Sequence, residues 1–70
     1  MNSNKLRGVI AERGFSQREV ANAIGINEKT FYLKMKKGVF GTDEAEKMIK
    51  LLSIENPAEI FFTQSVQHGK

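Results

Sequence analysis

A chain of 70 residues with eleven basic and eight acidic side chains is long enough for one domain, and we expect a single domain over residues 1–70. The absence of cysteine excludes disulfides and thiolate metal sites. The single histidine, His68, lies two residues from the end, and the carboxylates of the second half are expected to be cap and surface residues, so we find no cluster suited to a metal centre or to acid–base catalysis. We therefore expect no metal, no cofactor and no enzymatic activity.

The charge is divided unevenly along the chain. Residues 1–40 carry eight lysines and arginines against three carboxylates, a net charge of +5, whereas residues 41–70 carry three against five, a net charge of −2. A basic half points to a polyanionic partner on one face, although small proteins often carry uneven charge without such a partner. No apolar run approaches the length of a membrane span, and the polar N-terminus leads into no signal-like apolar block, so we expect no membrane partner and a cytoplasmic location.

Apolar residues recur at helical spacing between glycines, which predicts an all-α, compact five-helix fold. The first helix is expected from Asn4 to Arg13, with Leu6, Val9 and Ile10 as its buried stripe. Gly14 then supplies the left-handed residue that ends it.

The second and third helices carry clear start signals. Ser16 is the expected N-cap of the second helix, with Glu19 completing a capping box, and the helix continues through Ile24. Asn27 is the expected N-cap of the third helix, which runs to about Lys37 and stops at a glycine.

The fourth helix opens near Thr42, and its expected inward residues are Ala45, Met48, Ile49 and Leu52. The fifth helix begins at Asn56-Pro57, where Asn56 is expected to cap and Glu59 to complete a box-like arrangement. Ile60 and Phe61 are expected to return to the core. We expect an ordered core over about residues 4–62 and a fraying tail over 63–70.

The short joint between the second and third helices carries the functional prediction. Only Gly25, Ile26 and Asn27 separate the two helices, so they must cross steeply and present the second of them outward, as in a helix-turn-helix. A small Ala21 permits close approach, Gly25 permits positive φ, and Phe31 anchors the third helix from below.

The stretch from Ser16 to Phe31 resembles the Cro/C1-type, lambda repressor-like helix-turn-helix family, and the resemblance extends over Leu6 to Phe61. It implies a sequence-specific DNA-binding transcriptional regulator. The short length is similar to a phage Cro that represses from an operator. Lys34 departs from the family pattern, which often has an apolar residue there. Either its methylenes lie along the core with the ammonium in water, or the register of the third helix is shifted by one residue.

The outer face of the third helix is the expected reading surface. Its period places Glu28, Lys29, Tyr32 and Lys36 outward, and the resemblance implies that Glu28 and Lys29 meet base edges in the major groove. Glu28 could equally be a favourable charge at a helix N-terminus, and Tyr32 a half-buried cover of the core. In the family, the residue at Gln17 binds a phosphate and braces the recognition helix.

The full set of candidate DNA-binding residues comprises Gln17, Arg18, Asn27, Glu28, Lys29, Thr30, Tyr32, Lys36 and Lys37. Lys5 and Arg7 are further candidates, from an N-terminal arm. For all the lysines, a solvated surface without a partner is the alternative.

A second copy of the chain is an expected partner, because one domain covers only one half-site and two half-sites lie about 34 Å apart. Phe61, Phe62 and Val66 are the candidate dimer surface, in solution or only on DNA, and Phe62 could instead pack internally. The alternative function is a protein-binding module, such as an antitoxin or a modulator of another repressor, with that repressor as its partner.

Overall fold

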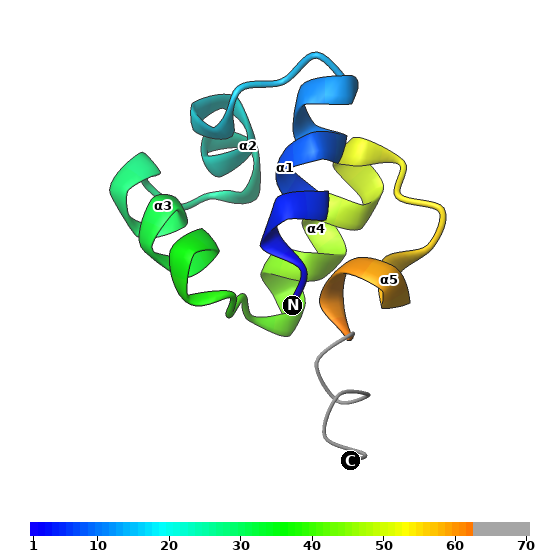
Figure 1. The fold of residues 1–70 in the computed structure, drawn as a ribbon. Coiled ribbons are helices and arrows are strands. Elements are labelled where there is room, and N and C mark those ends of the chain that lie inside the picture. Colours follow the sequence, from blue (N-terminus) through cyan, green and yellow to red (C-terminus); the bar gives the residue numbers. More distant parts are fainter. Residues whose placement is uncertain (63–70) are drawn as a thin grey trace.

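The computed structural model describes residues 1–62, which fold into five helices (Figure 1). They are α1 (Ser3–Glu12), α2 (Gln17–Ile24), α3 (Glu28–Lys37), α4 (Thr42–Leu52) and α5 (Pro57–Phe61). The predicted all-α, five-helix fold is confirmed. Only α1 is displaced from its expected position, by one residue, because Asn2 and not a later residue caps it through a bond from the Lys5 amide.

Side-chain caps set the starts of α2 and α3. Ser16 Oγ accepts from the Glu19 amide at 3.1 Å, and Glu19 Oε1 accepts from the Ser16 amide at 2.8 Å, so the predicted capping box is confirmed. Asn27 Oδ1 accepts from the Thr30 amide at 2.8 Å. Both cap residues have extended backbone, with ψ of 163° for Ser16 and 161° for Asn27, which aims the side chain at the first turn.

The expected cap of α5 is wrong. Asn56 has ψ of 73° instead of the extended value found at Ser16 and Asn27, and its side chain accepts no bond from a backbone N–H of the first turn. Asn56 Nδ2 donates instead to Glu59 Oε2 at 3.3 Å. Pro57 does occupy the first helical position, where its missing N–H costs nothing.

All five helices contribute to one hydrophobic core, and α2 contacts α1, α3 and α4 while α5 packs on α1. Val9, Ala45 and Ile49, expected to be buried, are only half-buried and pack against the edge of this core. Within residues 1–62 the buried side chains are Leu6, Ile10, Val20, Ala21, Ile24, Phe31, Met35, Met48, Leu52, Ile60 and Phe61.

The left-handed backbone at Gly25, in the α2–α3 turn, can be tested by replacing it with alanine. The same replacement at Gly8, inside α1, serves as the comparison. Gly25 has φ of 86°, and Gly8 lies inside α1; an added Cβ meets nothing within 4 Å at either position. We expect Gly25→Ala to lower the free energy of unfolding by about 1–2 kcal/mol, since a Cβ disfavours left-handed backbone. Gly8→Ala should raise it by about 0.5–1 kcal/mol.

Urea titrations of the two variants and the wild type measure both effects. Neither added Cβ would clash with another atom, so opposite signs for the two changes in the free energy of unfolding would identify backbone conformation as their cause. A Gly25→Ala protein as stable as the Gly8→Ala protein would rule out the left-handed turn as a structural requirement.

Candidate nucleic-acid interface

A tight turn joins α2 to α3 and leaves α3 at the edge of the molecule (Figure 1). Gly25 takes the left-handed conformation, and its amide donates to the Asn22 carbonyl at 3.2 Å. The Ile26 amide donates to the Ala21 carbonyl at 3.0 Å, and the Ile26 side chain packs against the core. The predicted positive φ of Gly25 is confirmed.

Two side chains attach α3 to the core. Phe31 and Met35 are 0% and 1% exposed, and the Phe31 ring lies 5.3 Å from the Phe40 ring at an angle of 54°. Such a tilted aromatic pair is a favourable packing arrangement. Burial at positions 31 and 35 excludes the shifted register that Lys34 left open.

The C-terminal end of α3 is fastened by polar bonds to two other elements. Lys34 Nζ lies 2.6 Å from Glu44 Oε2, and Glu44 Oε1 accepts from the Gly41 amide at 2.8 Å. Ser3 Oγ donates to the Met35 carbonyl at 2.8 Å. The Lys34 side chain remains 35% exposed, and its ammonium has in addition a carboxylate partner that the sequence analysis did not predict.

The environment of Glu44 favours its charged form. The hydrogen bond from Lys34 lowers the pKa of the Glu44 carboxyl most strongly, and partial burial acts against this by raising it. The Gly41 amide and the positive charges of Lys34 and Lys47 lower the pKa further, so the net shift is downward.

The remaining α3 side chains form an outward face. Tyr32 is 60% exposed, so the alternative in which it covers the core is wrong. Leu33, which the sequence analysis missed, is 49% exposed beside it. The helical period places Leu33 outward once Phe31 and Met35 point inward, so this signal was available in the sequence. We define the α3 outer face as Glu28, Lys29, Tyr32, Leu33, Lys36 and Lys37, all exposed.

The α3 outer face carries net positive charge, because three lysines stand against the single carboxylate of Glu28. In the part of the chain that the structure describes, Lys5 and Lys34 form the two ion pairs, whereas Lys29, Lys36 and Lys37 have no carboxylate partner. Three lysines on one exposed helix raise the local positive potential, and this potential attracts polyanions within about 8–10 Å at moderate salt.

The expected N-terminal arm is absent. Lys5 and Arg7 lie within α1, which begins at Ser3. The Lys5 ammonium pairs with Glu59 on α5, and Arg7 Nη1 donates to Asn4 Oδ1 at 2.8 Å. These interactions hold the two cations on the surface of α1.

Gln17 and Arg18 form the first turn of α2, where backbone N–H groups point outward. Arg18 is exposed and Gln17 is half-buried. Gln17 Oε1 is buried and accepts no hydrogen bond from residues 1–62.

Asn27 and Thr30 lie at the start of α3. Asn27 Oδ1 is used by the cap, which leaves its exposed amide N–H groups as the available donors. Thr30 is half-buried and takes part in the cap through its backbone N–H.

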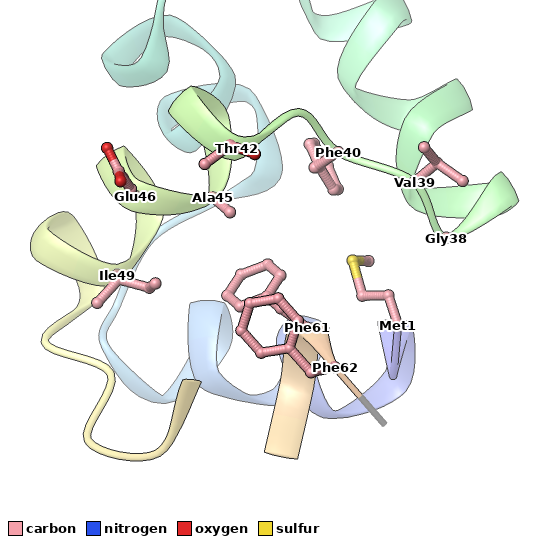
Figure 2. A pocket seen from close by; sticks show the side chains of 10 residues that line it. All are labelled: Met1, Gly38, Val39, Phe40, Thr42, Ala45, Glu46, Ile49, Phe61 and Phe62. Atoms are coloured by element: carbon pink, nitrogen blue, oxygen red, sulfur yellow. The ribbon is translucent and has the colours of Figure 1, made fainter. Parts of the chain in front are cut away.

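Two of the expected dimer residues, Phe61 and Phe62, lie at the C-terminal end of α5. Phe61 is 8% exposed and belongs to the core, Phe62 is 63% exposed, and Val66 lies outside the described residues. Phe61 and Phe62 border a hollow of about 410 Å³ between the α3–α4 loop, α4 and the end of α5 (Figure 2). Its lining consists of Met1, Gly38, Val39, Phe40, Thr42, Ala45, Glu46, Ile49, Phe61 and Phe62.

No protein-family model, curated protein or solved structure matches this chain. Among residues 1–62, no three histidine, cysteine, aspartate or glutamate side chains are grouped so that they could hold a metal ion. In the same residues, no helix combines the length and the apolar character needed to cross a bilayer.

Proposed function

We propose that this protein is a sequence-specific DNA-binding transcriptional regulator that places α3 in the major groove of an operator. The observation that carries the proposal is the division of α3 into two buried residues and an outer face with three unpaired lysines. The major groove admits an α-helix whose outer face is free of the rest of the domain, and the cations of α3 match the flanking phosphates.

Each candidate residue receives a role from its position. Glu28 and Lys29, in the first turn of α3, meet base edges: the carboxylate accepts from a cytosine amino group and the ammonium donates to guanine O6 or N7. Tyr32 meets a thymine methyl group or a phosphate. The remaining candidates contact the phosphate backbone and set the position of α3: Gln17, Arg18, Asn27, Thr30, Lys36 and Lys37.

The resemblance to Cro/C1-type regulators supports repression by occupation of an operator in a bacterial host, and the proposal includes no catalytic step. A protein-binding module, acting as an antitoxin or on a partner repressor, is the second candidate. The hollow and the exposed Phe62 beside it form an apolar surface of the kind that binds another protein, and this favours the second candidate.

Binding to duplex DNA at increasing salt concentration separates the two candidates. A labelled mixed-sequence duplex is titrated with the protein while fluorescence anisotropy is recorded. A protein that neutralises phosphates loses affinity steeply and linearly in log–log form as salt rises. Absence of duplex binding at low salt would reject the DNA-binding proposal and leave the protein-binding module.

Two lysines on α3 are expected to behave differently when removed. Lys37→Ala should weaken binding to a selected duplex and to a mixed duplex by the same factor, and reduce the salt slope by about 0.9, because it contacts phosphate. Lys29→Ala should weaken binding to the selected duplex more, because it reads a base. Both are measured with a duplex selected from a random library.

Lys50→Ala is the matched control, since Lys50 is an exposed lysine on α4 and outside the proposed interface. It should change neither affinity. Equal losses for Lys29→Ala on both duplexes would argue against base reading by Lys29, and an unchanged salt slope would remove Lys37 from the interface.

A second copy of the chain completes the proposed regulator, because one α3 reads a single half-site. Phe62 and the hollow beside it supply the apolar surface. Phe61 supports this surface from within the core and does not present it. A two-fold contact here joins two identical hollows, as closed symmetric dimers require.

Phe62→Ser tests the dimer without disturbing the core, since Phe62 is mostly exposed. In sedimentation equilibrium with a two-half-site duplex, we expect two wild-type chains per duplex at concentrations where Phe62→Ser binds as one. The variant should retain the wild-type affinity for a single half-site. If Phe62→Ser assembles on the duplex as the wild type does, the dimer surface lies elsewhere.

A further inference from the structure

Leu33 is an apolar side chain in a charged setting. It is 49% exposed in the middle of α3, although its neighbours Phe31 and Met35 supply the helix with its buried contacts. Of the four large hydrophobic side chains that are exposed in residues 1–62, Tyr32 and Leu33 are adjacent on α3. The exposed part of the Leu33 side chain is not packed in the core, so it can make an apolar contact with a ligand.

The helical period defines what surrounds Leu33. Lys29, Lys36 and Lys37 stand four residues before, three residues after and four residues after it, which are the positions that neighbour it on a helix surface. Since none of these lysines has a carboxylate partner in the described chain, an apolar centre lies within a cationic rim.

Duplex DNA offers the complementary pattern. In its major groove the C5-methyl group of thymine is the apolar group on the base edges, and rows of phosphates flank it on both sides. An anionic membrane requires a wide apolar helix face, but the buried side chains of α3 are already packed in the core.

We propose that Leu33 is a specificity-determining residue that contacts the C5-methyl group of a thymine in the operator. This proposal rests on the proposed DNA-binding function and deepens it. The operator then contains a thymine whose methyl group matters for binding, in addition to the bases that Glu28 and Lys29 read.

Replacement of thymine by deoxyuridine tests this contact, because it removes the methyl group and keeps every hydrogen-bonding group of the base. A duplex is first selected from a random library with the wild-type protein, and each thymine is then replaced in turn. We expect one replacement to weaken wild-type binding about fourfold, as for the loss of one buried methyl group. Leu33→Ala should bind the thymine duplex about as weakly as the wild type binds the deoxyuridine duplex, and should not distinguish the two.

Lys37→Ala is the comparison variant, and it should weaken both duplexes while keeping the fourfold difference between them. Circular dichroism verifies that Leu33→Ala is folded, as expected for an exposed helical position. If the wild type binds a selected duplex but no single thymine methyl matters, or if Leu33→Ala still distinguishes the two duplexes, this proposal alone is overturned. If the wild type binds no duplex, the proposed function fails with it.

Discussion

Phe31→Ala is expected to abolish the cooperative thermal unfolding transition of the protein. The side chain is fully buried, contacts the Phe40 ring and is one of the two residues that attach α3 to the core. Truncation of a buried phenylalanine costs about 3–5 kcal/mol. A domain of this size has a net stability of roughly 3–5 kcal/mol from its core, so this one substitution removes most or all of it.

Far-UV circular dichroism during a thermal melt measures this effect. Tyr32→Ala is the matched control because it removes an aromatic ring from the next position, where the side chain is 60% exposed. It should change the free energy of unfolding by less than about 0.5 kcal/mol. A Phe31→Ala protein that melts cooperatively near the wild-type temperature would show that α3 is held by contacts other than Phe31.

Glu44→Gln is expected to lower the free energy of unfolding by about 1–2 kcal/mol at neutral pH. Glutamine keeps the size of the side chain and an oxygen for the Gly41 amide, but it removes the charge that receives the Lys34 ammonium. Hydrogen bonds to charged groups contribute more than neutral ones, and this pair is only partly exposed to screening by water.

The pH dependence of this difference has a definite sign. Because the pKa of the Glu44 carboxyl is lowered in the folded state, the charged carboxylate stabilises the fold at every pH above its ordinary, unfolded-state value. That contribution is lost as the pH falls through the lowered folded-state pKa. Urea titrations should therefore show the wild type and Glu44→Gln approaching equal stability in acid.

Glu46→Gln is the control for this effect, since Glu46 is an exposed carboxylate on the same helix and forms no ion pair within residues 1–62. Its stability should follow that of the wild type at all pH values. A constant gap between the wild type and Glu44→Gln down to acid pH would contradict the assigned role of the carboxylate.

The fold was largely predictable from the sequence because its signals are local. Ser16 and Asn27 cap helices through bonds to residues three positions away, and Gly25 ends α2 through its own backbone preference. Phe31 and Met35 define the inward side of α3 by spacing alone. These signals predicted where α3 begins, where it ends and which side of it faces inward.

Features that depend on residues distant in the chain were not predictable in this way. The contact of Lys34 with Glu44 joins side chains ten positions apart, on separate helices, so no helical period indicates it. The bond from Ser3 to the Met35 carbonyl spans 32 positions. Asn56 shows the reverse case, in which a residue of the expected type fails to cap because the preceding loop gives it the wrong backbone angle.

Only Phe31 and Met35 are buried on α3, and this determines which of its residues can be substituted without loss of the fold. The residues that attach α3 to the core and the residues that face outward are different, so the outer face of α3 can be substituted while its buried contacts are kept. Libraries randomised over the six outward positions should remain folded, since exposed substitutions rarely shift stability by more than about 0.5 kcal/mol. New preferences for ligands can thus evolve, or be engineered, without compensating mutations in the interior.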